Sequence, residues 1–287
     1  MQADQFSFIL YNDFFAGTDE HFTNGLSLSW INDTKYFKHF YGGMSLNQMI
    51  FTPTDTSQTS AQYDDIPYIG YLYLSTYLFD IYENHFFEYR VELGMTGKNA
   101  YAKEVQNNFH TLINDDKSQG WDTQLSTYYT YNLLLRYGEI SYQKKLPYDG
   151  EIDWFNHIGV QGGNFVQNIF WGSTFRIGRN YVKNFNLHYP YLKEQIAQFS
   201  KKAHKGFGYS LSLGVNADYL FYSLLLEKAE DEGYKVKQYN FNGSIYIGYD
   251  LYYNRHKTTL FYQKQSPYTD GHNEINTLGG LLYNYHF

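Results

Sequence analysis

The chain contains no cysteine and only 5 prolines, and charged residues make up 18% of its 287 residues. The lack of cysteine excludes a disulfide framework and thiolate chemistry. No apolar run is long enough for a membrane-spanning helix, and the mean hydropathy of -0.55 argues against a helical membrane protein. The net charge of -7 argues against nucleic acid as a partner.

Aromatic residues, in contrast, are abundant, with 33 tyrosines and 23 phenylalanines. This excess is typical of a transmembrane β-barrel, whose aromatic side chains form girdles at the two membrane interfaces. A soluble β-sandwich or lipocalin-like barrel is the alternative, but such a fold has difficulty burying so many aromatic side chains. Residues 1–4 lack the basic and apolar regions of a signal peptide, so for an envelope protein we expect a mature chain with an added start residue.

Apolar and polar residues alternate with period two along many segments, which is the pattern of a strand with two different faces. The segment 236–253 is the clearest case, because Ile245 and Ile247 share one face and Ser244 and Asp250 share the other. The same pattern predicts twelve strands, over about 5–12, 24–33, 40–50, 67–80, 85–95, 123–146, 152–162, 168–179, 207–228, 236–253, 257–265 and 276–287.

An even number of strands fits an all-β fold, a single transmembrane antiparallel up-and-down β-barrel that comprises residues 1–287. At Gly138 the alternation changes parity, which predicts a bulge or a bend. The connection 180–206 is long for an inner turn, and its residues 191–199 have the spacing of a helix. The predicted outer loops cover about 13–23, 51–66, 96–122, 163–167, 229–235 and 266–275.

Polar side chains gather between the first two predicted strands, where Asn12 and Asp13 precede the turn and Thr23 and Asn24 follow it. Carboxylate, amide and hydroxyl oxygens at neighbouring strand ends suit a hard cation. On spacing alone, a solvated hairpin loop is the favoured interpretation.

A second polar cluster lies in the predicted outer loop 96–122. Residues 104–113 read as a short helix with Val105, Phe109 and Leu112 in an apolar stripe, which would rest on the barrel wall or on lipid. His110 lies beside this stripe, and a histidine suits general base catalysis near neutral pH. Asp116, six residues later, cannot share its helical face, so the chain must turn back to bring the two together. The alternative is that His110 is a loop histidine with no catalytic role.

One cation and one histidine would suffice for ester hydrolysis, because the metal stabilises an oxyanion and the histidine activates water. The chain has no zinc-ligand spacing of cysteine and histidine. It also lacks the G-x-S-x-G motif of serine hydrolases, so a serine nucleophile is not indicated.

Several short motifs span most of the chain, and through them the sequence resembles the outer-membrane lipid A 3'-O-deacylases of the LpxR type. The matching pieces are Asn12-Asp13, Thr18-Asp19, Thr23-Asn24-Gly25, Thr52-Pro53-Thr54-Asp55, Asp64-Asp65-x-Pro67-Tyr68-x-Gly70, His110, Gly120-Trp121-Asp122-x-Gln124-Leu125 and Gly162-Gly163-Asn164.

The resemblance implies a twelve-stranded barrel of the bacterial outer membrane that removes the 3'-linked acyloxyacyl group of lipid A in a calcium-dependent reaction. It implies a site between the barrel wall and a loop helix, with His110 as general base and with Asn12 and Asp116 as further catalytic residues. It also implies a Ca²⁺ site at Asp13, Thr23 and Asp116.

Two departures from the family pattern concern the site. Asp116 stands where the family has glutamate, with Asp115 as a possible substitute, and Ile66 stands where many members have arginine. We therefore expect the substrate contacts to come from Asp65, Lys103 and Lys117.

The expected partners are lipid A or lipopolysaccharide as substrate and the surrounding outer-membrane lipid, and we expect a monomer. Two alternatives stay open. One is an outer-membrane phospholipase, and the other is a porin or other non-catalytic barrel that has lost the activity.

Overall fold

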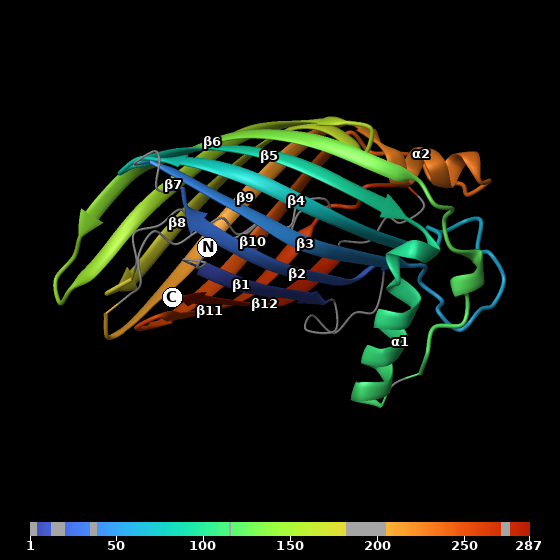
Figure 1. Ribbon diagram of the computed structural model, residues 1–287, viewed down its shortest axis with the longest axis horizontal. Coiled ribbons are helices and arrows are strands. Elements are labelled where there is room, and N and C mark those ends of the chain that lie inside the picture. The colour runs from blue at the N-terminus through green and yellow to red at the C-terminus, as the bar shows by residue number, and fades with distance from the viewer. Residues whose placement is uncertain (1–4, 13–20, 35–38, 115, 182–204, 271–275) are drawn as a thin grey trace.

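The computed structural model describes residues 5–12, 21–34, 39–114, 116–181, 205–270 and 276–287. Within them, twelve antiparallel strands form one closed barrel (Figure 1), which confirms the predicted fold class. The strands are β1 (Gln5–Asn12), β2 (His21–Asp33), β3 (Phe40–Thr52), β4 (Ile69–Ile81), β5 (His85–Thr96), β6 (Tyr129–Lys145), β7 (Gly150–Gly163), β8 (Val166–Arg179), β9 (Phe207–Ser223), β10 (Phe241–Tyr253), β11 (His256–Gln265) and β12 (Asn276–His286).

Two α-helices interrupt this pattern, α1 (Ala102–Ile113) and α2 (Leu224–Asp231), together with the short 3₁₀ turns η2 (Lys98–Ala100) and η3 (Trp121–Thr123). The strand predicted over 207–228 therefore ends at Ser223, because Leu224, Leu225 and Ala229 change to helical spacing and become buried. The strands predicted over 123–146 and 236–253 begin later than expected, at the first residues of β6 and β10.

The predicted irregularity near Gly138 is a β-bulge. The pairing of β6 with β7 shifts by one residue between Ile140 and Tyr142, and the strand then continues to Lys145. The bulge preserves one long strand and thus the count of twelve. The helix predicted over 191–199 lies outside the described residues.

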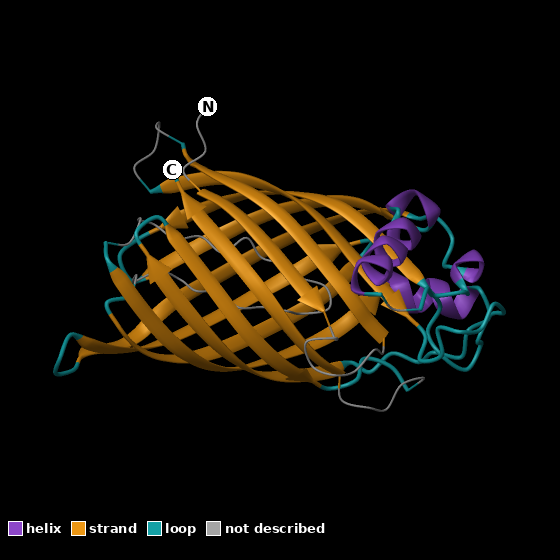
Figure 2. Cartoon of the chain, turned by 90° about the horizontal axis from the view of Figure 1, so that it is seen from below, coloured by secondary structure: helices purple, strands orange, loops and turns teal. Residues whose placement is uncertain are grey.

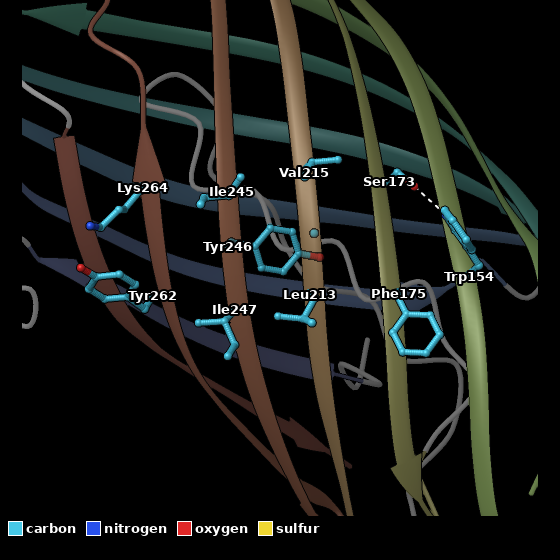
Figure 3. Close-up of a pocket in the computed structure, with 11 residues that line it drawn as sticks. Trp154, Ser173, Phe175, Leu213, Val215, Ile245, Tyr246, Ile247, Tyr262 and Lys264 are labelled. Atoms are coloured by element: carbon cyan, nitrogen blue, oxygen red, sulfur yellow. Dashed lines mark hydrogen bonds between the residues drawn. The ribbon is translucent and has the colours of Figure 1, made fainter.

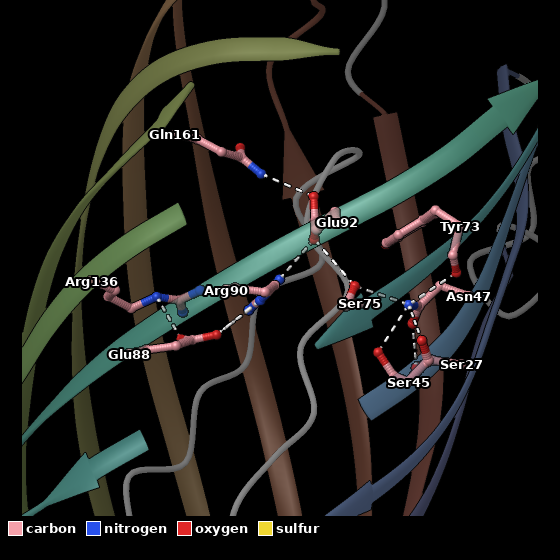
Figure 4. A network of polar contacts seen from close by, with 10 residues as sticks. All are labelled: Ser27, Ser45, Asn47, Tyr73, Ser75, Glu88, Arg90, Glu92, Arg136 and Gln161. Atoms are coloured by element: carbon pink, nitrogen blue, oxygen red, sulfur yellow. Dashed lines mark hydrogen bonds and ion pairs between the residues drawn. The ribbon is translucent and has the colours of Figure 1, made fainter. Parts of the chain in front are cut away.

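Each strand turns one face outward and one face into the lumen. On β5, the outward Tyr89 and Leu93 are exposed, whereas the inward Glu88, Arg90 and Glu92 are buried. On the lumen side of the wall these charged side chains satisfy each other (Figure 4) in a chain of contacts along β4 to β7: Glu88 with Arg90 and with Arg136, Arg90 with Glu92, and Glu92 with Ser75 and Gln161.

The two ends of the barrel differ. At one end the strands are joined by short turns, such as 82–84, 146–149 and 254–255. At the other, the loop end, longer loops and both helices gather (Figures 1 and 2). In outer-membrane barrels the turns are periplasmic and the long loops extracellular. Neither α-helix of the described residues has the length and apolar character needed to cross a membrane.

The loops at the loop end hold one another in place. The Glu232 carboxylate accepts hydrogen bonds from the Ser126 amide and the Tyr128 hydroxyl, at 3.1 and 3.0 Å. The backbone of Lys235 donates to the Tyr63 carbonyl at 2.7 Å. These contacts join the loops β3–β4, β5–β6 and β9–β10, so the loop end is a packed structure on which a site can be built.

Candidate functional site

Helix α1 lies on the outward face of the barrel wall (Figure 2). Gln48 and Ile50 of β3 have the outward phase of Met44 and Leu46, which are exposed, yet both are buried. The Gln48 side-chain amide donates to the Ala100 carbonyl at 2.6 Å, and Ile50 packs in a cluster with Tyr68, Ala102 and Trp121. A strip of wall that would otherwise face lipid is therefore covered by the helix.

The close approach of α1 to the wall depends on Gly70 of β4. A Cβ atom at this position would lie 2.6 Å from the Cβ of Ala102 and 3.2 Å from that of Ala100. Real side chains do not approach so closely, so any larger residue at Gly70 must displace the start of the helix.

Outward positions of four adjacent strands form one cross-strand row, and at Ile50 this row is covered by the start of α1. Asn12 of β1 pairs with Asn24 of β2, Asn24 with Ile50 of β3, and Ile50 with Gly70 of β4. Both asparagines have the outward phase but are only 3% and 6% exposed. Two buried amides therefore stand on the outward face of the barrel, where most side chains are apolar and exposed.

The strand end that carries Asn24 is irregular, because the register of β2 against β3 shifts between Phe22 and Asn24. Thr23 is the extra residue of this bulge, and bulges redirect side chains near functional sites. Asn12 and Asn24 are thus paired on adjacent strands, and Thr23 precedes Asn24 in the chain. Asp13, the fourth member of the predicted cluster, lies outside the described residues.

The face of α1 that meets the wall carries Ala102, Gln106 and His110, which are buried and spaced four residues apart. The predicted apolar stripe was therefore only partly correct. Val105 packs against the Ile50 cluster, but the fully buried positions are largely polar. The physical reason is the wall beneath them, which presents amides as well as apolar side chains.

His110 lies two helical turns beyond Ala102. At 1.5 Å per residue this is about 12 Å, or two to three strand spacings. Figure 1 shows α1 starting beside β4 and running in the direction of β1. His110 is 5% exposed and lies in the last turn of α1.

The chain turns back after the helix, as the sequence predicted. Asn114 ends α1 in the left-handed conformation, with φ of 59°, which asparagine tolerates well. The turn brings the Asp116 carbonyl oxygen to Nδ1 of His110. A carbonyl can only accept, so Nδ1 carries the proton and Nε2 presents its lone pair. Asp116 thus acts on His110 through its main chain, and the residue as a whole is exposed.

Gln106 is a candidate that the sequence reasoning missed. The fully buried Trp121 donates from its indole nitrogen to Oε1 of Gln106 at 2.8 Å, which fixes the orientation of the amide. Gln106 is 1% exposed, and its Nε2 has no hydrogen-bond partner among the described residues. Its position four residues before His110, on the same helical face, was the signal that could have identified it.

Asp65, a predicted substrate contact, lies in the loop between β3 and β4. Its two carboxylate oxygens accept hydrogen bonds from the backbone amides of Thr54 and Ile66, at 2.8 and 2.6 Å. Nearby, hydrogen bonds from Ser57 and then Gln58 hold the pKa of Asp55 below its usual range. Both aspartates therefore order this loop.

The other two predicted substrate contacts are lysines near α1. Lys103 forms an ion pair with Asp122 at 3.2 Å; the Asp122 side chain is exposed and that of Lys103 is partly exposed. Lys117 is exposed in the segment after the helix. Both ammonium groups are accessible from solvent on the helix side of the site.

The oxygen atoms beneath α1 can be compared with the needs of a calcium ion. The residues that the structure describes contain no cluster of three or more histidine, aspartate or glutamate side chains that could hold a metal. Within the same residues, however, Oδ1 of Asn24 is buried and has no hydrogen-bond partner. An amide oxygen is a ligand that Ca²⁺ accepts, and Asn24 directly follows Thr23. Asn24 therefore offers one oxygen ligand that suits the predicted cation.

Comparisons with known proteins agree with this architecture. The family model described as outer membrane protein LpxR matches residues 1–287. No protein with a curated description matches the sequence. The structure is similar to that of LpxR from Salmonella typhimurium, with a TM-score of 0.85, 16% sequence identity, and coverage of 99% of this chain and 100% of that one.

Other barrels are less similar. The β-domain of the Bordetella autotransporter BrkA has a TM-score of 0.49 and 11% identity, with coverage of 99% and 97% of the two chains. A KdgM porin has a TM-score of 0.39 and 7% identity, with coverage of 99% of both chains.

Proposed function

Because this chain belongs to the LpxR family of outer membrane proteins, a family of lipid A deacylases, we propose that it hydrolyses the 3'-linked acyloxyacyl ester of lipid A in the outer leaflet. The observation that supports this most directly is His110, buried against the wall with its Nδ1 on the Asp116 carbonyl. This contact leaves Nε2 as the atom that takes a proton, which is the requirement for a general base.

The reaction starts when Nε2 of His110 removes a proton from a water molecule. The oxygen of that water attacks the ester carbonyl carbon, and the carbonyl oxygen gains negative charge. The side-chain amide of Gln106 donates a hydrogen bond to this oxyanion, since Trp121 already holds its other end. The bond from the acyl carbon to the sugar oxygen then breaks, and His110 returns its proton to the leaving oxygen.

We assign the calcium ion to the strand ends beside the base. Asp13, Thr23 and Asp116 would hold it, with Oδ1 of Asn24 as a further ligand and Asn12 in the adjacent position of the row. Bound calcium would supply positive charge that stabilises the oxyanion.

The position of the site suits a substrate that stays in the membrane. The row of asparagines and the buried face of α1 lie on the outward side of the wall, so acyl chains can remain in lipid while the ester enters beneath the helix. Lys103 and Lys117 are accessible to the phosphates of lipid A, and we assign them to this contact. Asp65 contributes by ordering the adjacent loop.

Mass spectrometry of lipid A from cells that express the protein tests this proposal. With the wild type, lipid A should lose the mass of the 3' acyloxyacyl group, and with His110→Ala the rate should fall by about 10²–10⁴. A chelator in the assay of the purified protein should abolish the reaction. An acyl pattern that the wild type leaves unchanged in the presence of calcium would refute the proposal, and fatty acid release from glycerophospholipid instead would favour a phospholipase.

The lumen argues against the porin alternative. Charged side chains that point into it pair with neighbours on the adjacent strand, such as Arg136 with Glu88 at 3.2 Å and Arg176 with Asp153 at 2.7 Å, and all four are buried. At the loop end, an apolar cluster that includes residues of α2 packs inside the barrel. We therefore expect no single-channel conductance from the wild type in planar bilayers.

A further inference from the structure

The wall opposite α1 has a groove on its outward face, of about 580 Å³, across β7 to β11 (Figure 3). Strands β3 and β9 stand six places apart in the ring of twelve, so this groove and the site beneath α1 lie on opposite sides of the barrel. Any ligand of the groove is therefore separate from the substrate at His110.

Two cross-strand rows of outward side chains form the walls of the groove. The row nearer the loop end contains Ser173, Val215, Ile245 and Lys264, and the next row contains Phe175, Leu213, Ile247 and Tyr262. The groove thus runs across the strands, and four strand spacings give it a length of about 19 Å.

The groove is hollow because Ser173 is small where its neighbours on β8 are large. Outward positions on either side of it hold Trp171 and Phe175. The Ser173 hydroxyl accepts a hydrogen bond from the indole of Trp154 at 2.6 Å (Figure 3), and this contact fixes one end of the groove. Its lining is otherwise almost entirely apolar, which suits a hydrocarbon chain.

Lys264 stands at the other end of the groove, exposed and one residue before β11 ends at the loop end. A lysine on the lipid-facing side of a barrel is costly unless its ammonium reaches the headgroup region. There, it attracts anionic headgroups. The groove is therefore an apolar surface depression with one cationic side chain, Lys264, at the level of the outer headgroups.

A second hollow on the wall lacks this combination. It has a volume of about 420 Å³ and lies across β4 to β6, with Thr76 among outward side chains such as Leu78, Val91 and Leu133. Its cationic lining residue, Arg90, points into the lumen and pairs with glutamates there. Only apolar side chains and Thr76 face the outside, so this hollow serves as an internal control.

We propose that the groove across β7 to β11 binds an acyl chain of a phosphate-bearing lipid of the outer leaflet, with the phosphate paired to Lys264. The two apolar rows contact the acyl chain, and Trp154 closes the end of the groove that lies away from the headgroup. Lys264, at the other end, selects an anionic headgroup. The bound lipid is a structural partner of the barrel and is not the molecule that is hydrolysed. This assignment does not depend on the proposed catalytic activity.

Native mass spectrometry of the purified full chain in detergent tests the proposal, with dimyristoylphosphatidylglycerol as the probe and dimyristoylphosphatidylcholine as the neutral comparison. The wild type should bind the anionic probe in preference to the neutral one. Lys264→Gln should weaken binding of the anionic probe roughly fivefold and remove the preference. Ser173→Leu, which fills the groove, should weaken binding of both lipids.

Two matched variants provide controls. Lys144→Gln removes an exposed lysine of β6 beside the short turn 146–149, at the end of the barrel away from Lys264. Thr76→Leu fills the second hollow. Both variants should bind the probes as the wild type does. Excess inorganic phosphate should not displace the lipid, because the chain contributes to binding. Equal binding by the wild type, Lys264→Gln and Ser173→Leu would overturn the proposal. So would a protein dimer without lipid adducts that is lost in Ser173→Leu, since the occupant would then be a second copy.

Discussion

The wall beneath α1 and the wall across β8 to β10 are built by the same strand alternation, yet they differ in what the outward positions hold. On β1 to β3, the outward Asn12, Asn24 and Gln48 are polar and buried. On the opposite side, the outward Leu213 and Ile247 are apolar and exposed. The difference shows that the phase of a strand decides which way a side chain points, whereas the covering element decides which environment it meets.

The buried polar side chains near α1 carry a free-energy cost unless they are hydrogen-bonded. A buried polar group without a partner costs free energy, so native proteins pair almost all of them. Gln48 is paired with the Ala100 carbonyl of the turn before α1. Within the described residues, Oδ1 of Asn24 and Nε2 of Gln106 are not paired. Gln106 lies on the helix face that carries Ala102, and Asn24 pairs with Ile50, which packs against Ala102, so a ligand at this edge of the helix would satisfy such atoms.

After His110→Ala, the largest effect is expected when the side-chain amide of Gln106 is removed. Gln106→Leu should lower kcat by about 10²–10³, because the oxyanion loses a donor. Gln106→Glu should lower it by a similar factor, since glutamate can retain a contact with Trp121 but has no N–H group to donate. The measurement is the rate of lipid A deacylation by purified protein at saturating calcium. Full activity of the glutamate variant would contradict the donor role and leave Gln106 with a packing role.

A smaller effect is expected at the wall itself. Asn24→Leu should raise the calcium concentration for half-maximal activity by roughly tenfold, because the cation loses an oxygen ligand or its support. The matched control is Asn156→Leu, which removes an outward amide of β7 far from α1 and should leave the calcium dependence unchanged. A titration of activity against free calcium distinguishes the two variants. The same curve for Asn24→Leu and the wild type would remove Asn24 from the calcium site.

The smallest effect is expected from Asp116→Ala. The Asp116 carbonyl, which holds His110, is retained in this variant, so kcat at saturating calcium should stay close to that of the wild type. The loss of the carboxylate, a proposed calcium ligand, should appear in the calcium requirement and not in kcat. If Asp116→Ala is instead as inactive as His110→Ala, the carboxylate takes part in the chemistry and the main-chain contact alone does not explain its role.

The barrel could be predicted from sequence because alternation is a local property. Each strand repeats it over many residues, and the slip at Gly138 already indicated the bulge at Ser141. The end of β9 could not be predicted in this way, since Leu224 and Leu225 continue an apolar pattern that fits a strand as well as a helix. The apolar cluster at the loop end favours the helix.

The candidate site was predictable only in part. The positions of Asn12, Thr23 and His110 followed from the predicted loops and from the family resemblance. The role of Gly70 did not, because a glycine in a strand gives no sign of which element will approach it. The contact of His110 with the Asp116 main chain was also hidden, since carbonyl groups are the same at every residue.

The central claim is that the space between α1 and the wall is the active site. The most direct test is the mass spectrum of lipid A from cells that express one of two glycine variants. Gly70→Val places side-chain atoms where Ala102 lies, and displacement of the helix should slow deacylation roughly 10²-fold. Gly42→Val adds the same atoms on β3, where a Cβ atom would meet only Thr34 at 3.7 Å, and lipid A should be deacylated as with the wild type. Both should fold as barrels, which heat-dependent electrophoretic mobility checks. Wild-type deacylation by folded Gly70→Val would contradict the claim that the space between α1 and the wall is the active site.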